Sequence, residues 1–258
     1  MPAPINPLKK ALKEGKIQFG SWLCMGDTYS ADIMGHAGFD WLLIDGEHGP
    51  NDIRSILAQL QVLAAHESHP VVRVPVGQTH LMKQVLDLGA QSIVVPMVET
   101  ADHARQLVRD VTYPPNGDRG VAYAVVRAGA FGVTENYGKT ADDQICLIVQ
   151  VENRAGLAAL DEILTIDGID GVFVGPADLA ADMGHIGDPT QPDVQAAILD
   201  AITRIRAAGK APGILSGNDD LTSAAIKAGA LFVGVGDDLS MLRRTATETC
   251  AKWKSKTA

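Results

Sequence analysis

The hydrophobic and polar positions of the chain follow one repeated pattern. A short apolar run rich in β-branched residues leads into a polar turn and then into a stretch with helical spacing. Eight such runs occur, at residues 17–24, 39–44, 70–74, 91–95, 145–151, 171–174, 211–215 and 231–235. Because the runs are apolar on both faces and alternate with helices, they predict parallel strands covered by helices. Eight strands in 258 residues favour a closed (β/α)₈ barrel over an open doubly wound sheet.

The predicted α/β barrel uses residues 1–258 as a single domain, since barrels of this class need about 250 residues. Residues 113–142 depart from the pattern, because they form a long connection without a predicted strand. Long connections in compact domains are usually functional or disordered. Two interpretations stay open: a surface excursion, or a flap or oligomer contact that supplies Arg119 or Arg127.

Composition and charge favour small-molecule chemistry. The chain is 46% hydrophobic and 21% charged, which is typical of a soluble globular protein. Its 31 acidic and 22 basic residues give a net charge of −9, so general affinity for nucleic acid or for an anionic membrane is not expected. The three cysteines lie far apart, which predicts neither a disulfide framework nor a cysteine metal site.

The N-terminal sequence lacks the apolar core of a signal peptide, and no apolar run approaches the roughly 18 residues of a membrane span. The expected location is therefore the cytoplasm.

Polar residues that end the predicted strands are the candidates for chemistry, because barrel enzymes place their active sites at these strand ends. They are Asp45, Glu47, His48, Arg73, Glu99, Gln150, Glu152, Asp178, Asp237 and Asp238. Carboxylates without cysteine and with little histidine suit a hard divalent cation such as Mg²⁺ or Mn²⁺. The set predicts a metal-assisted reaction at the barrel mouth.

Glu152 and Asp178 are the preferred metal ligands, since they follow consecutive strands and should converge on one side of the mouth. Two protein carboxylates leave coordination positions for substrate oxygens and water. In the alternative interpretation, each carboxylate caps the helix that follows it.

His48 and Arg73 are the candidates for proton transfer and charge stabilisation. A histidine can act as general base near neutral pH, and Asp45 could hold the His48 ring or tune its basicity. Arg73 suits a substrate carboxylate or a developing enolate. Alternatively, His48 is an ordinary surface histidine and Arg73 forms an internal ion pair with Asp45 or Glu47.

Three other chemistries are disfavoured by the same residues. A Schiff-base aldolase needs a lysine at a strand end, and no predicted strand end carries one. Asp237 and Asp238 would repel a phosphate at the position where barrels commonly bind one. The sequence GVGDDL lacks the third glycine of a nicotinamide-binding fingerprint.

Seven motifs, taken in order along the chain, carry a family resemblance. They are IDGEHGP, VVRVP, VVPMVET, YPPNGDRG, IVQVEN, VFVGPADLA and VGVGDD. Together they resemble the HpcH/HpaI family of metal-dependent (class II) pyruvate aldolases, which includes 4-hydroxy-2-oxoheptanedioate and 2-dehydro-3-deoxyglucarate aldolases. The resemblance implies a barrel whose last helix, near residues 238–254, is exchanged between subunits of a homohexamer built as a trimer of dimers.

The resemblance also implies roles for individual residues. Glu152 and Asp178 would bind Mg²⁺, Mn²⁺ or Co²⁺, with no organic cofactor. His48 would be the acid/base, directly or through a metal-bound water, and Arg73 would stabilise the enolate. Gln150, Gly175, Pro176 and the Ala177 amide would bind the substrate. Asp87 would raise the basicity of His48, either within one chain or across a subunit interface. Asp45 and Glu47 would support the histidine.

The implied reaction is reversible cleavage of a 4-hydroxy-2-oxo acid into pyruvate, or a similar 2-oxo acid, and an aldehyde, as in aromatic or sugar acid catabolism. Trp22, Leu215 and the segment 119–126 are expected on the aldehyde side. Two alternatives remain: a related barrel lyase acting on a CoA thioester or an isocitrate-like acid, and a non-catalytic barrel that serves in binding or assembly.

Overall fold

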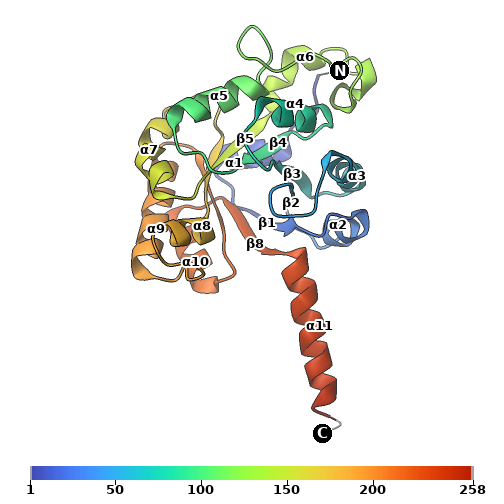
Figure 1. Ribbon diagram of the computed structural model, residues 1–258. Coiled ribbons are helices and arrows are strands. Elements are labelled where there is room, and N and C mark those ends of the chain that lie inside the picture. The colour runs from blue at the N-terminus through green and yellow to red at the C-terminus, as the bar shows by residue number, and fades with distance from the viewer. Residues whose placement is uncertain (1, 257–258) are drawn as a thin grey trace.

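The computed structural model describes residues 2–256 and shows a closed barrel of eight parallel strands in the order β1 to β8 (Figure 1). The predicted (β/α)₈ fold is therefore confirmed. The predicted single domain also includes residues 1, 257 and 258, which lie outside the described part.

The strands lie close to their predicted positions, and two of them match the prediction at both ends. They are β1 (Gln18–Leu23), β2 (Trp41–Asp45), β3 (His69–Arg73), β4 (Ser92–Val95), β5 (Cys146–Val151), β6 (Gly171–Val174), β7 (Ala211–Leu215) and β8 (Phe232–Asp237). The helices are α1 (Pro7–Lys13), α2 (Thr28–Gly35), α3 (Ile53–Leu63), α4 (Thr79–Asp87), α5 (Ala101–Val111), α6 (Tyr137–Thr140), α7 (Arg154–Leu164), α8 (Pro176–Asp182), α9 (Pro192–Ala207), α10 (Asp219–Ala228) and α11 (Asp238–Lys254).

The inside of the barrel is filled with side chains, so it is a packed core. The indole of Trp41 stacks on the ring of Phe232, with centroids 3.9 Å apart and planes at 22°. Gly20 makes room for it, because a Cβ at this position would overlap the Trp41 ring. Above this layer Trp22 packs against Phe173 at 5.6 Å between centroids. These two rings form the bottom of the cavity at the barrel mouth.

A second hydrophobic layer lies between the barrel and the surrounding helices. Alternate strand residues such as Leu42, Ile44 and Val72 face this layer, because successive side chains of a strand point to opposite faces. α9 illustrates the helix side, with Ile198 and Ile202 among its fully buried residues. Both faces of the sheet are thus covered, as the continuous apolar strands predicted.

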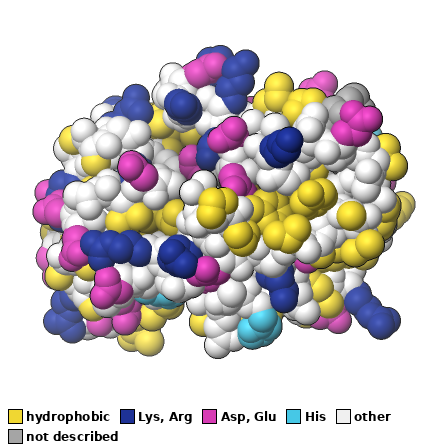
Figure 2. Space-filling view, turned by 90° about the horizontal axis from the view of Figure 1, so that it is seen from above, with side chains coloured by type: hydrophobic (Ala, Val, Ile, Leu, Met, Phe, Trp, Pro, Cys, Tyr) yellow, Lys and Arg dark blue, Asp and Glu magenta, His cyan; other side chains and the backbone are white. Residues whose placement is uncertain are grey.

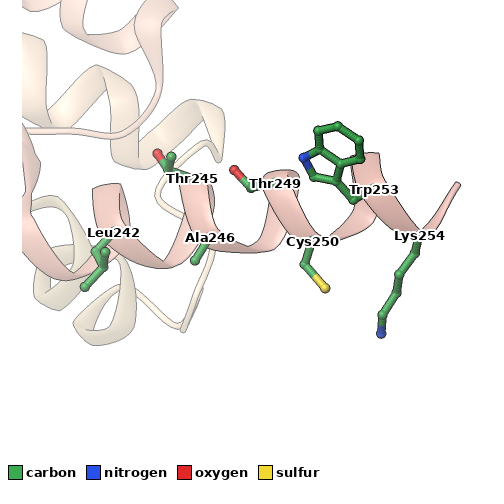
Figure 3. Close-up of a pocket in the computed structure, with 7 residues that line it drawn as sticks. All are labelled: Leu242, Thr245, Ala246, Thr249, Cys250, Trp253 and Lys254. Carbon is green, nitrogen blue, oxygen red and sulfur yellow. The ribbon is translucent and has the colours of Figure 1, made fainter. Parts of the chain in front are cut away.

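α11 differs from the other long helices because it extends away from the barrel (Figure 1). The Asp238 carboxylate anchors its first turn by accepting hydrogen bonds from the backbone N–H groups of Cys24, at 2.8 Å, and Met25, at 3.3 Å. Asp238 is the one buried residue of the helix, whose whole length the structure describes. Leu242 and Trp253 are each 60% exposed. A surface pocket runs along α11, and Figure 3 shows that the residues lining it all come from this helix.

The segment 113–142 packs on the side of the barrel and contains short helical turns, including α6. Arg127 donates to the Leu88 carbonyl at 2.7 Å. Arg119 is buried, and its guanidinium lies 4.3 Å from the centre of the Tyr113 ring. No residue of this segment lines the cavity at the mouth. The flap interpretation, and the expectation that residues 119–126 line the aldehyde side, are therefore wrong for a single chain.

Within residues 2–256, no helix is long and apolar enough to cross a lipid bilayer. The face in Figure 2 carries acidic and basic side chains interspersed with hydrophobic patches, without a large field of one sign.

Candidate active site

A cavity of about 430 Å³ opens at the C-terminal ends of the strands. Twelve of the predicted candidates line it: Trp22, Asp45, His48, Arg73, Gln150, Glu152, Gly175, Pro176, Ala177, Asp178, Leu215 and Asp237. Cys24, Phe173, Pro189, Ser216 and Gly217 complete the lining. The structure thus brings together polar groups from β2, β3, β5 and the start of α8.

One side of the mouth holds the guanidinium of Arg73 between two carboxylates. Asp45, the last residue of β2, is in register with Arg73, the last residue of β3. Arg73 donates from Nε to Asp45 Oδ1 at 2.8 Å and from Nη2 to Oδ2 at 2.7 Å. Its third nitrogen, Nη1, lies 2.8 Å from Glu47 Oε2. Burial acts to lower the pKa of Arg73, but the bonds to Asp45 and the charges of both carboxylates raise it overall.

The ion pair predicted as an alternative for Arg73 is therefore present, yet it does not remove the residue from the site. Arg73 still lines the cavity, and its guanidinium carbon lies 6.0 Å from the centre of the Trp22 ring. A guanidinium fixed in this way is oriented before any substrate arrives.

Asp45 also shapes the turn that carries His48. Its Oδ1 accepts hydrogen bonds from the backbone N–H of Glu47 at 3.0 Å and of His48 at 3.4 Å. The His48 ring itself lies 3.8 Å from Glu47 Oε1, and its side chain is 69% exposed. The expectation that Asp45 holds the His48 ring is therefore wrong for this chain, because Arg73 and the turn backbone occupy its oxygens.

The opposite side of the mouth holds Glu152 and Asp178, carboxylates that form no ion pair with any residue the structure describes. Glu152 follows β5 and is only 3% exposed. Its Oε1 accepts the backbone N–H of Met97 at 2.8 Å, and its Oε2 accepts Gln150 Nε2 at 2.7 Å. Met97 has a φ of 54°, a strained value for this residue type that aims its N–H at the carboxylate. Gly175 leaves the space that Glu152 fills, because a Cβ there would collide with Oε2.

The electrostatics of this side fit a divalent cation. Burial raises the pKa of Glu152, and the charges of Asp178 and Glu47 raise it further against the two hydrogen bonds. Gln150 Oε1 is buried, and no described residue hydrogen-bonds to it. Asp178 is exposed to the same cavity from the first turn of α8, where an acid is also favourable for the helix. Oxygen donors around an uncompensated buried charge are what Mg²⁺ or Mn²⁺ prefers.

Cys24 lies in the cavity but is not suited to act as a nucleophile. Burial raises the pKa of its thiol to about 12, with the charges of Asp45 and Asp238 adding to the effect. The thiolate is therefore scarce at neutral pH.

Glu99 and Asp238, predicted at strand ends, do not line the cavity: Glu99 accepts a hydrogen bond from Asn153, and Asp238 anchors α11. Asp87 does not reach the mouth either. It ends α4, away from the cavity, and one of its oxygens is buried without a hydrogen-bond partner among the described residues. Burial raises its pKa, and the charges of Arg119 and Lys83 oppose this. Within one chain Asp87 does not contact His48.

The additional cavity residues divide into two groups. Cys24 follows β1 directly, and Ser216 and Gly217 follow β7, so the strand-end rule could have assigned them to the mouth. Phe173 and Pro189 carry no such signal, because Phe173 lies inside a strand and Pro189 in the connection after α8.

Comparison with known proteins shows extensive similarity. Residues 18–245 match the family model described as HpcH/HpaI aldolase/citrate lyase. The chain is 57% identical to the hydroxypyruvate/pyruvate aldolase of Roseobacter denitrificans, over 98% of this chain and 99% of that protein. It is 53% identical to the 4-hydroxy-2-oxovalerate aldolase of Rhodococcus jostii, over 98% of each. A crystal structure of a family protein from Burkholderia cenocepacia superposes with a TM-score of 0.93 at 40% identity, covering 96% of this chain and 99% of that one.

Proposed function

The chain belongs to the HpcH/HpaI aldolase/citrate lyase family, and from this premise we propose how its cavity catalyses an aldol reaction. The chain is a pyruvate aldolase that cleaves 4-hydroxy-2-oxo acids, as the names of its close relatives support. The observation that carries the mechanism is the contrast across one cavity, with a fixed guanidinium on one side and uncompensated carboxylates on the other.

Glu152 and Asp178 hold the divalent metal ion in this proposal, and Mg²⁺, Mn²⁺ or Co²⁺ fits their oxygen donors. The bound ion would supply Lewis acidity, which makes the C3 protons of a 2-oxo acid easier to remove. Gln150 orients Glu152 through the 2.7 Å hydrogen bond and presents its free oxygen to the cavity. The Ala177 amide, in the first turn of α8, binds the substrate carboxylate, since such N–H groups lack intrahelical partners.

His48 moves the proton. In the cleavage direction it accepts the proton of the 4-hydroxyl group as the C3–C4 bond breaks, and in the synthetic direction it removes a C3 proton from pyruvate. Its exposed ring is free to reach substrate atoms in the cavity, and Glu47 Oε1 lies 3.8 Å from its Nε2. Asp87 could support His48 only from another subunit, because it lies away from this cavity.

Arg73 stabilises the enolate oxygen. Its guanidinium is held by Asp45 and Glu47, so little reorganisation is needed as negative charge develops. Trp22 and Phe173 close the cavity below and exclude water from the reacting atoms. Leu215 and Ser216 form part of the opposite wall, where we place the aldehyde.

A lyase acting on a CoA thioester fits less well. CoA carries several phosphate charges, and Arg73 is the one Lys or Arg side chain that lines the described cavity. Both neighbouring carboxylates already bind it. A purely structural barrel would not need a strained Met97 or a buried, charge-repelled Glu152.

Exchange of the pyruvate C3 protons with deuterated water, followed by NMR, tests the proposal. We expect proton exchange that stops when EDTA is added and returns with Mn²⁺ or Mg²⁺. We also expect the enzyme to cleave 4-hydroxy-2-oxo acids. In the synthetic direction, a panel of aldehydes then identifies the acceptors. Exchange that survives both complete metal removal and Glu152→Ala would exclude the mechanism.

We also propose that α11 packs on a neighbouring subunit. A hollow of about 430 Å³ between α2 and the start of α11 is lined by apolar groups, including the 61% exposed Ile33. Exposed Leu242 and Trp253 would be covered by such an exchange, in agreement with the expected homohexamer.

Light scattering of the wild type, Leu242→Asp and the matched polar-face variant Thr247→Asp tests this assembly. Smaller particles for Leu242→Asp alone would support the exchange, and a wild-type monomer would exclude it.

A further inference from the structure

A second cluster of metal-ligand side chains lies on the barrel floor, the face at the N-terminal ends of the strands. Asp32 lies in α2, His36 caps the C-terminus of that helix, and His66 follows α3. We propose that these three residues, the floor triad, bind a late transition-metal ion such as Zn²⁺ at a site separate from the catalytic centre.

The ligand atoms are already gathered. One oxygen of Asp32 and one ring nitrogen of each histidine all lie within 4.8 Å of one another. His66 Nε2 is 2.7 Å from Asp32 Oδ1, and His36 Nε2 is 3.9 Å from the same oxygen. Ligands about 2 Å from a zinc ion are roughly 3 to 3.5 Å apart in a tetrahedron, so small side-chain rotations suffice.

The local fold positions these groups. Asp32 and His36 are four residues apart, which places them on the same face of α2. The His66 ring packs against the backbone at Gly35, where a Cβ would approach ring atoms to 2.6 Å. The His66 side chain is only 7% exposed, while that of His36 is 77% exposed. One ligand is therefore fixed by packing, and another is free to close on the ion.

The donor set selects the metal. Two imidazoles and one carboxylate suit Zn²⁺, Co²⁺ or Ni²⁺, whereas Mg²⁺ prefers oxygen donors alone. Three protein ligands leave a fourth position for water. A hollow next to α2 and α3, lined by both histidines, gives the ion access from solvent.

The site joins α2 to the end of α3, two helices that pack together. A bound ion therefore adds a cross-link between them, and it stabilises the folded state by mass action. This effect does not depend on the reaction at the mouth, which lies at the opposite ends of the strands.

Co²⁺ titration of a Glu152→Gln, Asp178→Asn double variant tests the proposal, because the catalytic ligands are then removed. We expect the visible absorption of a single nitrogen-ligated Co²⁺ per chain, displaced by Zn²⁺, and a Zn²⁺-dependent rise in melting temperature. Adding His36→Ala to this double variant should weaken Co²⁺ binding at least about tenfold. Loss of a residue that only supports a metal ligand already costs about this much, and His36 is itself a proposed ligand.

His80→Ala is the matched control, because His80 is an exposed helix histidine outside the triad. It should leave both signals unchanged. His66→Gln should also abolish Co²⁺ binding, and circular dichroism checks that this buried-site variant is folded. The His36 variant should remain folded because the His36 side chain is exposed. No Co²⁺ absorption in the parent, or equal binding by His36→Ala and His80→Ala, would overturn the proposal.

Discussion

The two sides of the cavity carry similar acidic residues in different electrostatic states. Asp45 and Glu47 share the single guanidinium of Arg73 at 2.7 to 2.8 Å, so both contact a positive charge within the chain, although burial still raises the pKa of Glu47. Glu152 receives two hydrogen bonds but has no ion-pair partner among residues 2–256, and burial and its acidic neighbours raise its pKa. The first side holds its own cationic group. In our proposal a divalent cation plays this part on the second side.

This difference shows why strand-end position alone does not define a metal site. Every acid of the mouth follows or ends a strand, yet of these acids only Asp45 and Glu47 pair with an arginine among the described residues. The comparison predicts effects of different size on the two sides.

Glu152→Gln should have the largest effect. We expect aldol cleavage to fall at least about 10⁴-fold, because a Lewis acid contributes several kcal/mol and each 1.36 kcal/mol is a factor of ten. The amide still accepts the Met97 N–H, so the fold should persist. Steady-state kinetics with circular dichroism measure both. Glu162→Gln, on the surface of α7, is the control, and equal activity of the two variants would contradict the account.

His48→Ala should slow C3 proton exchange about 10³-fold, which is the usual contribution of a general base. The protein should stay folded, since the side chain is 69% exposed. The exposed position also permits rescue by added imidazole. Near-wild-type exchange in this variant would remove His48 from the base role, and His80→Ala serves as the matched exposed-histidine control.

Arg73→Lys should lower kcat about 10²-fold. A lysine has one nitrogen, so it cannot bond both oxygens of Asp45 as Arg73 does and at the same time point at the enolate oxygen. The free energy of unfolding should also fall by about 1 to 2 kcal/mol, since a charge-assisted hydrogen bond is lost in a buried pair.

Arg105→Lys provides a control of the same chemistry. Arg105 also contacts two carboxylates, Asp102 and Glu162, but on the surface, where ion pairs contribute at most about 1 kcal/mol. Equal losses of stability and activity in both lysine variants would show that the buried pair has no special role.

The pH dependence of metal-free protein should show the smallest effect. The pKa of Glu152 lies above its unfolded value of 4.5, so the folded state keeps this proton longer. The contribution of Glu152 therefore makes the unfolding free energy fall as pH rises from about 4.5 through the raised pKa. Urea unfolding in EDTA should show this fall in the wild type relative to Glu152→Gln, and Mn²⁺ should remove it. If the unfolding free energies of the wild type and Glu152→Gln changed in parallel with pH in EDTA, an uncompensated charge on Glu152 would be excluded.

Much of the barrel could be predicted from the sequence because it depends on local pattern. Residues 171–174 and 211–215 were predicted as strands and are β6 and β7, since their apolar runs have clear polar boundaries. β2 and β8 continue into polar residues, through Asp45 and Asp237. Hydrophobicity could not show these ends, because the backbone pairing continues where the side chains turn polar.

The partners of the site residues could not be predicted so well. The register of β2 and β3 sets Asp45 opposite Arg73, and that register is not visible in either strand alone. It directs Asp45 away from the His48 ring. The floor triad likewise joins α2 to a residue thirty positions later, which only the packing of α2 on α3 brings near. The strand-end rule does not apply to that face of the barrel.

Mn²⁺ binding followed by electron paramagnetic resonance is the most direct test of the contrast between the two sides of the mouth. In a His36→Ala background, which removes the floor triad, we predict one Mn²⁺ per chain that binds more tightly with pyruvate. Glu152→Gln and Asp178→Asn should each weaken binding at least about tenfold, whereas the surface variant Glu162→Gln should not. Unchanged Mn²⁺ affinity in both ligand variants would contradict a metal site between Glu152 and Asp178.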